Sequence, residues 1–352
     1  MAREVAIVGA GVIGCAIARE LAARGVRCTV LDARAVAGGA TQASAGMLAP
    51  YVEAHEGGPL LELGIQSLAL YDDWIGTLRS EGRAVEYRSV GTLQIALTGD
   101  GAAALRDVPG TWVDASELAR TVPDLAAAHG AVRNGAHGYV DAAGLARALA
   151  GSAERHGARF LRTRVQRLAS GGRLTMVCDD REVDADGVVL AAGAWTNSIA
   201  GLATPPLRPV RGQLLHVRWD GAPVPAILWG PDCYIVPRTD GTLLVGATVE
   251  EVGFDERTTA EGIAGLLDAA RSLLPRLSAG SVIEARAGLR PATPDNLPVI
   301  GRDPAVPAVI HASGHYRNGV LLAPITAKAV ADLVVGGETT IDLSPFRPER
   351  FL

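Results

Sequence analysis

The chain has 352 residues, 48% of them hydrophobic, which is enough for one large core or two interleaved domains and excludes a disordered or fibrous protein. The formal net charge is -5 and there is no basic run, which argues against nucleic acid and anionic membrane surfaces as partners. Composition therefore favours a small-molecule partner.

The four cysteines, Cys15, Cys28, Cys178 and Cys233, form neither CxxC pairs nor a close-spaced framework. This is typical of reduced thiols in a cytoplasmic protein, with no disulfide scaffold and no metal site. The opening MAREVAIVGAGVIGCAIA has the basic start and apolar centre of a signal peptide, but three glycines inside it argue against one. No other stretch reaches the roughly 20 apolar residues that cross a bilayer, so we expect no membrane partner.

The N-terminal segment predicts a strand, a tight turn and a helix. An apolar run at 5–8 is followed by Gly9, Gly11 and Gly14 in GxGxxG spacing, and a helical pattern then continues to Gly25. Gly9 allows the turn, Gly11 lets the backbone approach a pyrophosphate, and Gly14 lets the helix pack close to the strand. The helix N-terminus would offer N–H groups and positive dipole to phosphates.

A second apolar run, 26–31, closes on Asp32, where a carboxylate can accept hydrogen bonds from ribose hydroxyls. The complete unit predicts a dinucleotide-binding fold but does not choose between NAD and FAD. The next segment, 37–50, consists almost wholly of small residues, as a backbone lying along an extended cofactor requires. A flexible linker is the alternative, although a linker would be more polar.

Two later segments repeat parts of this pattern. Residues 185–197 predict a buried strand and a small-residue turn, which fits a strand beside a nucleotide or any central strand of a parallel sheet. Residues 308–312 predict a strand, followed by a glycine-containing turn and a helix over about 321–335. An ordinary strand-to-helix turn is the alternative for this last segment.

Five motifs occur in an order that closely resembles the FAD-dependent amino-acid oxidases of the D-amino-acid oxidase type: GAGVIG with Asp32, SAGMLAP, CYIVPRTDGTLLVGAT, GLRPATPDNLPVIG and SGHYRNGVLLAP. Within that family the sequence is most similar to the bacterial glycine oxidases associated with thiamine biosynthesis. The similarity covers essentially the whole chain, and the last three motifs are far more specific than the first.

The resemblance implies a mixed α/β fold, with a Rossmann-like FAD-binding domain and an interleaved antiparallel-sheet substrate domain. The FAD-binding domain is expected to comprise 1–50, 135–205 and 285–352, and the substrate-binding domain 51–134 and 206–284.

The sequence agrees with such a substrate domain, because several segments alternate like strands. These segments are 85–97, 213–219, 233–238 and 242–249, and the last two flank a hairpin turn at 239–241. Residues 141–156 predict a helix capped by Asp141.

The resemblance also implies which residues bind the cofactor. They are Gly9, Gly11, Val12, Ile13, Gly14, Asp32, Ala33, Ala40, Thr41, Ala45, Gly46, Met47, Val165, Gly193, Gly314, His315, Tyr316, Arg317, Asn318, Gly319, Val320 and Leu321. The turn before the last helix would set backbone donors and positive dipole beside the N1/C2=O edge of the flavin, which favours the reduced cofactor. Because neither 288–301 nor the C-terminal motif contains a cysteine, we expect noncovalent FAD.

Three residues are implied to act on the substrate. Arg290 matches the carboxylate-binding arginine of the family, and its guanidinium fork suits that task. An ion pair with Asp295 or another acid is the alternative. Tyr234 matches the tyrosine whose hydroxyl reaches the same carboxylate, although such a tyrosine also serves packing. Arg317 matches a second site arginine, with a surface cation as its alternative.

Four residues are placed in the substrate pocket: Met47, Ala49, Asp232 and Val249. Met47 matches a residue near the flavin ring, with core packing as the alternative. Asp232 and Val249 depart from the family, which has histidine and a longer methionine there. The departures leave room for a substrate larger than glycine, such as sarcosine, another N-substituted glycine or a small D-amino acid.

The implied reaction passes a hydride from the substrate α-carbon to flavin N5 and gives an imine, which water hydrolyses to a 2-oxo acid and an amine or ammonia. Molecular oxygen then takes the electrons and yields hydrogen peroxide. This chemistry needs no metal. Three alternatives stay open: an NAD-dependent dehydrogenase, a flavoprotein without turnover, and a flavin-dependent dehydrogenase with a quinone or protein acceptor. A homo-oligomer also stays open.

Overall fold

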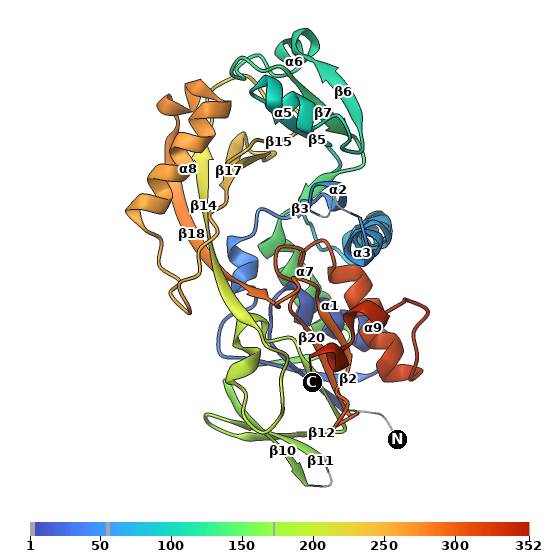
Figure 1. Ribbon diagram of the computed structural model, residues 1–352. Helices are drawn as coiled ribbons and strands as arrows, with labels where there is room; N and C mark the ends of the chain where they lie inside the picture. The colour runs from blue at the N-terminus through green and yellow to red at the C-terminus, as the bar shows by residue number, and fades with distance from the viewer. Residues whose placement is uncertain (1–3, 54–56, 172, 352) are drawn as a thin grey trace.

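The computed structural model describes residues 4–53, 57–171 and 173–351, and a six-stranded sheet forms the centre of its lower half (Figure 1). The strand order is β19-β20-β13-β1-β2-β9, and every neighbouring pair is parallel except β19 with β20. The strands are β1 (Glu4–Val8), β2 (Arg27–Asp32), β9 (Arg159–Arg162), β13 (Gly187–Leu190), β19 (Val299–Arg302) and β20 (Val309–Ser313).

Both faces of this sheet are covered, which explains why its strands read as continuous apolar runs. On one face Ile7 packs into a core with helices α1 (Val12–Ala23), α7 (Ala142–Arg155) and α9 (Ala323–Val335). On the other face Ala6 packs against a three-stranded sheet. The strands of that small sheet are β10 (Val165–Gly171), β11 (Arg173–Cys178) and β12 (Glu182–Ala185).

An eight-stranded sheet forms the upper half of the molecule in Figure 1, with helix α8 (Ala260–Leu273) packed on its outer face. Its order is β18-β14-β17-β16-β15-β5-β7-β6, antiparallel throughout except where β15 meets β5. The strands are β5 (Thr92–Ala96), β6 (Thr111–Asp114), β7 (Gly130–Asn134), β14 (Arg208–Arg218), β15 (Ile227–Trp229), β16 (Tyr234–Pro237), β17 (Thr242–Gly246) and β18 (Ser281–Ala292).

A second three-stranded sheet joins the two halves and consists of β3 (Met47–Leu48), β8 (Gly138–Val140) and β4 (Tyr87–Arg88). The other helices are short and lie around these sheets. The α-helices among them are α2 (Pro50–Glu53), α3 (Pro59–Ala69), α4 (Tyr71–Ser80), α5 (Gly99–Ala104) and α6 (Ala115–Thr121). The 3-10 helices are η1 (Ala40–Ala43), η2 (Gly193–Ser198), η3 (Pro275–Ala279), η4 (Ser344–Phe346) and η5 (Pro348–Arg350).

The expected mixed α/β fold is confirmed, with differences at element ends. Helix α9 begins at Ala323 rather than near 321, because the preceding residues form a turn. Asp141 occupies the N-cap of α7, but its side chain accepts no capping hydrogen bond. The predicted domain ranges stay a prediction, and strand β18 crosses the boundary set at residue 285, since it pairs with β14 as far as Ala292.

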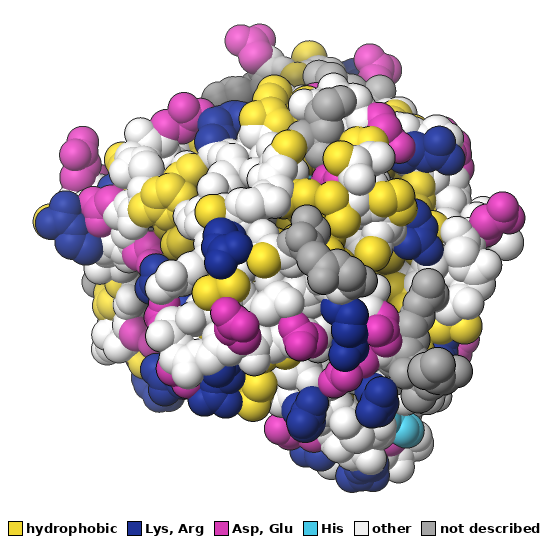
Figure 2. All heavy atoms as spheres, turned by 90° about the horizontal axis from the view of Figure 1, so that it is seen from below, with side chains coloured by type: hydrophobic (Ala, Val, Ile, Leu, Met, Phe, Trp, Pro, Cys, Tyr) yellow, Lys and Arg dark blue, Asp and Glu magenta, His cyan; other side chains and the backbone are white. Residues whose placement is uncertain are grey.

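On the surface seen from below, the described acidic and basic side chains are intermixed and form no broad patch of one sign (Figure 2). Such a face offers no extended positive stripe for a polyanion to follow. Among the described residues, no helix has both the length and the apolar character that a bilayer span requires.

Candidate active site

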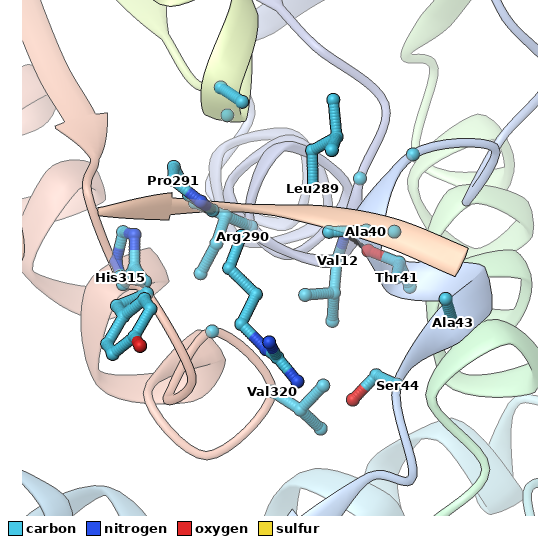
Figure 3. A pocket seen from close by; sticks show the side chains of 18 of the residues that line it. Val12, Ala40, Thr41, Ala43, Ser44, Leu289, Arg290, Pro291, His315 and Val320 are labelled. Atoms are coloured by element: carbon cyan, nitrogen blue, oxygen red, sulfur yellow. Dashed lines mark hydrogen bonds between the residues drawn. The ribbon is translucent and has the colours of Figure 1, made fainter. Parts of the chain in front are cut away.

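A cavity of about 600 Å³ lies between the six-stranded and eight-stranded sheets, and residues of both line it. It opens at the carboxyl end of β1 and β2, where nucleotides bind in open α/β sheets. Figure 3 shows Val12 and Thr41 on one side of it and Arg290, on β18, pointing into it. The volume and the two-sided lining suit an extended ligand that touches both halves of the molecule.

The turn between β1 and α1 and the first turn of α1 pack so closely on their neighbours that Gly9 and Gly14 have no room for a side chain. A Cβ atom on Gly9, which has φ +112°, would lie 2.3 Å from the carbonyl oxygen of Ala191. A Cβ atom on Gly14 would lie 1.9 Å from the carbonyl oxygen of Gly9. Gly14 thus packs behind the turn and does not line the cavity, whereas Gly9 and Gly11 do.

The N-terminus of α1 presents main-chain donors to the cavity. The Val12 N–H donates to Oγ1 of Thr41 at 3.1 Å, while no described residue accepts a hydrogen bond from the N–H of Gly11 or Ile13. The first N–H groups of a helix carry partial positive charge and need an acceptor from outside the helix. These two donors therefore fit an anionic group such as a pyrophosphate.

Asp32 ends strand β2 beside this turn and is fixed by two main-chain donors. Its Oδ2 accepts from the Ala10 N–H at 2.7 Å, and its Oδ1 accepts from the Arg34 N–H at 2.8 Å. A carboxylate has about four acceptor positions, so the Asp32 side chain retains capacity for the hydroxyls of a ribose. The glycine turn, the outward donors and this carboxylate together fit the nucleotide part of FAD.

Arg290 enters the cavity from the opposite side. Its Nη1 donates to the carbonyl oxygen of Thr248 at 2.9 Å and to that of Arg211 at 3.3 Å. The guanidinium lies over Gly212 of the neighbouring strand β14, where a Cβ atom would come within 2.2 Å of Nη2. The missing side chain at Gly212 therefore leaves the room that the Arg290 side chain occupies.

The alternative of an Arg290–Asp295 ion pair is not what the structure contains. Asp295 instead pairs with Arg350, whose Nε lies 2.9 Å from Oδ2. Burial is the largest single influence on the pKa of Asp295 and raises it. The Arg350 guanidinium and the Leu297 N–H together outweigh burial, so the pKa of Asp295 is lowered overall.

Tyr234 lies on β16 and, like Arg290, extends over a glycine of the neighbouring strand. It pairs with Gly246 on β17, where a Cβ atom would lie 2.4 Å from the Tyr234 hydroxyl oxygen. Its ring stacks on Trp229, with centroids 5.6 Å apart. Trp229 also lines the cavity and escaped the sequence analysis, although its place opposite Tyr234 in the β15–β16 hairpin was a usable signal.

The remaining predicted pocket residues meet at the same cavity. Met47 is half-buried and Ala49 is buried, while Asp232 and Val249 are exposed at the cavity's rim, Val249 to 52%. Arg317 is exposed as well, with its guanidinium 5.2 Å from the ring centroid of Tyr316. These candidate substrate-pocket residues therefore line the same cavity.

The turn between β20 and α9 forms another wall. His315 is buried in it, with Nε2 3.1 Å from Oγ1 of Thr326, and burial lowers the pKa of His315 to about 3, which keeps the ring neutral. Gly314 does not line the cavity. It has φ +74°, and a Cβ atom there would lie 2.8 Å from Cγ2 of Thr293, so the position favours glycine. Gly314 shapes the turn from behind, as Gly14 does at the other end.

All predicted site residues other than Gly14 and Gly314 line the cavity, but several lining residues were missed. The polar and aromatic ones are Arg34, Ser44, Thr163, Arg164, Gln166, Trp195, Ser198, Trp229 and Ser313. Arg34 follows Asp32 directly and could have been found with it. Ser44, Trp195 and Ser313 lie inside segments that the sequence analysis singled out for their small residues or glycines. Thr163, Arg164, Gln166 and Ser198 lie where a single sequence gives no signal.

A cavity with a dinucleotide-binding turn at one end and an arginine at the other fits a nucleotide-dependent oxidoreductase. Residues 4–333 match the family of FAD dependent oxidoreductases named DAO, and the chain belongs to that family. FAD is therefore its cofactor, as the resemblance implied.

Known relatives cover the whole chain. The bifunctional protein ThiO/ThiG of Trichormus variabilis is 36% identical over 100% of this chain, which spans 55% of that relative, about half its length. The glycine oxidase of Geobacillus kaustophilus is 36% identical over 99% of this chain and 97% of its own.

Two solved structures show the same fold. The crystal structure of glycine oxidase from Geobacillus kaustophilus has a TM-score of 0.93 at 34% identity, covering 99% of this chain and 100% of that one. The crystal structure of iminodiacetate oxidase from Chelativorans sp. BNC1 has a TM-score of 0.88 at 29% identity, covering 98% of each chain.

Proposed function

We propose that the protein oxidises glycine or a small N-substituted glycine at the α-carbon, with FAD as hydride acceptor and molecular oxygen as final electron acceptor. The observation that carries this proposal is the cavity itself. Arg290 and Tyr234 line one part of it, and the dinucleotide cradle around Gly11 and Asp32 lines another. Bound FAD would supply the redox chemistry, and the chain's own residues would bind and align the substrate.

Arg290 is the residue proposed to hold the substrate carboxylate. The carbonyl oxygens of Thr248 and Arg211 accept hydrogen bonds from its guanidinium and help to position it. A guanidinium held in this way can bind a carboxylate through parallel charge-assisted hydrogen bonds, worth roughly 1.5–3 kcal/mol each. That fixes both the position and the orientation of the α-carbon.

Tyr234 is proposed to add a hydroxyl hydrogen bond to the same carboxylate, while its ring and that of Trp229 form an aromatic wall. Arg317 lies at the exposed side of the lining, where it would raise the local concentration of an anionic substrate.

The proposed substrate class includes substituted glycines for two reasons. One relative by structure is an iminodiacetate oxidase, and iminodiacetate is an N-substituted glycine. In addition, Asp232 and Val249 are exposed where they line the cavity, so a substituent on nitrogen could extend toward solvent. Hydrogen peroxide as product, a cytoplasmic location and a homo-oligomer stay predictions.

An anaerobic titration tests the proposal. Purified holoprotein is mixed with glycine, sarcosine, iminodiacetate or D-alanine, and the visible flavin band is followed, with L-alanine as a control. We expect bleaching by glycine or a substituted glycine, and peroxide when air is admitted. A band that persists with every compound would overturn the substrate class, and bleaching without peroxide would replace oxygen by another acceptor.

A further inference from the structure

The turn before α9 carries three main-chain N–H groups that have no acceptor in the described part of the chain. Gly319, Val320 and Leu321 line the cavity, and no described residue accepts a hydrogen bond from their N–H groups. The turn is closed by the Leu322 N–H, which donates to the carbonyl oxygen of Asn318 at 2.8 Å. Because protein interiors rarely leave N–H groups unpaired, these three donors indicate an acceptor within the cavity.

Two side chains hold the same turn from the opposite side. Oγ of Ser67, on α3, donates to the carbonyl oxygen of Leu321 at 2.6 Å, and the hydroxyl of Tyr71, on α4, donates to the carbonyl oxygen of Val320. Ser67 and Tyr71 are fully buried, and neither lines the cavity. Burial raises the pKa of Tyr71 well above its ordinary value, so its hydroxyl stays protonated and remains a donor.

The direction of these hydrogen bonds decides where the N–H groups point. In a trans peptide the carbonyl of one residue and the N–H of the next point in opposite directions. With the Val320 carbonyl fixed toward Tyr71, the Leu321 N–H is directed away from α4. Figure 3 shows Val320 on this turn beside the guanidinium of Arg290, so the turn forms part of the wall around the reacting end of the cavity.

We propose that Tyr71 and Ser67 are positioning residues for the flavin. By holding the Val320 carbonyl, Tyr71 directs the Leu321 N–H at the flavin's pyrimidine edge, and by holding the Leu321 carbonyl, Ser67 fixes the next peptide and with it the turn. That edge gains negative charge on reduction, and donors fixed in advance stabilise such charge without reorganising. The hydroxyls of α3 and α4 therefore raise the reduction potential from outside the cavity. This inference rests on the FAD part of the proposed function and does not depend on the substrate.

The test uses sulfite, which adds to flavin N5 and gives an anionic adduct. Sulfite dissociation constants and midpoint potentials are measured for the holoproteins of wild type, Tyr71→Phe, Ser67→Ala and the double variant. Tyr87→Phe is the matched control, because the Tyr87 ring stacks on Tyr71 at 5.9 Å while its hydroxyl bonds Asp72 at 2.8 Å and not the turn.

We expect each single variant to weaken sulfite binding about fivefold and the double variant tenfold or more, as expected for the loss of hydrogen bonds. A tenfold change in the equilibrium between oxidised and reduced flavin corresponds to about 30 mV in the two-electron midpoint potential. The control should stay within twofold of wild type. If Ser67→Ala and Tyr71→Phe also bind sulfite within twofold of wild type, the proposal is wrong.

A merely structural role for the two hydroxyls would lower the melting temperature and leave sulfite affinity and potential unchanged, so melting is measured alongside. Ser67→Ala is the smaller change and decides the question if Tyr71→Phe folds poorly. No substrate enters these measurements. A failure of glycine-type acids to reduce the wild-type flavin would therefore refute the proposed substrate class and leave the sulfite result standing.

Discussion

Arg290 is the residue on which the proposed reaction depends most, and its geometry distinguishes two replacements. Arg290→Lys keeps a positive charge but loses the planar fork, whereas Arg290→Ala loses both. We expect the substrate concentration for half-reduction of the flavin to rise about tenfold with lysine and roughly a hundredfold with alanine, on the scale of one or two charge-assisted hydrogen bonds.

The measurement is the anaerobic titration described above, with Arg218→Ala as control, because Arg218 is exposed at the end of β14 and outside the cavity lining. FAD content is determined for every variant, so that a weaker substrate response is not mistaken for lost cofactor. Half-reduction of Arg290→Ala at the wild-type concentration would remove Arg290 from substrate binding.

At this scale the sequence could predict residues inside dense motifs and little else. Gly9 and Asp32 stand in a pattern whose chemistry is local, whereas Tyr234 was predicted only through the family resemblance, and all three line the cavity. For Arg290, residue-level reasoning left an ion pair with Asp295 open. What settles that alternative is Arg350, which binds Asp295 from the far end of the chain, and such long-range pairs leave no trace in local sequence.

Among the elements, the strap loop, residues 247–259 between β17 and α8, links the two ends of the cavity. The buried Arg211 side chain forms ion pairs with two acidic residues of this loop, Glu250 and Asp255. Its Nη1 lies 3.1 Å from Oδ2 of Asp255. Farther along, Glu256 accepts two hydrogen bonds from Arg34, at 2.8 and 2.6 Å.

Aromatic contacts reinforce the same end of the strap loop. The Arg34 guanidinium lies 4.3 Å from the ring centroid of Trp195, and Trp195 in turn contacts Phe254, with centroids 6.0 Å apart. Because Arg34 and Trp195 line the cavity, the loop is fastened over the cofactor end by these contacts.

Removing the Arg34–Glu256 ion pair should weaken FAD binding. The Arg34 and Glu256 side chains are 37% and 30% exposed, so their ion pair is worth at most about 1 kcal/mol. We therefore expect Glu256→Gln to raise the FAD dissociation constant up to about fivefold, measured by flavin fluorescence during reconstitution of the apoprotein. Glu251→Gln is the control, since Glu251 pairs with Arg208 at the exposed surface. Equal affinities in the two variants would contradict this role of the loop.

For the molecule as a whole, sequence patterns predicted the elements better than their assembly. The runs that became β1, β2 and β20 were recognisable because a parallel sheet covered on both faces needs continuous apolar strands. Which strands join was not recognisable. The register that places Arg290 opposite Val210, and Gly212 opposite Gly288, depends on pairing between segments far apart in the chain.

Buried histidines give the molecule a pH dependence. Burial lowers the pKa of His137 to about 4 and that of His315 to about 3, and it also lowers the pKa of His311. An unfolded histidine titrates near 6.5, so between about pH 4 and 6.5 the unfolded chain binds more protons than the folded one. The contribution of these histidines to stability is therefore largest above pH 6.5 and falls as the pH drops through this window.

His137 allows the sign and size of this effect to be measured. It is fully buried, with Nδ1 2.8 Å from Oγ1 of Thr92, and asparagine can replace that hydrogen bond without titrating. A shift from 6.5 to about 4 predicts that wild type loses about 2 kcal/mol more unfolding free energy than His137→Asn between pH 7 and pH 5. Urea unfolding of both holoproteins at fixed excess FAD measures this difference, because the flavin's own pH dependence cancels between them. His129→Asn, at an exposed position, should keep the wild-type loss, and equal losses in wild type and His137→Asn would show that His137 does not contribute to the pH dependence.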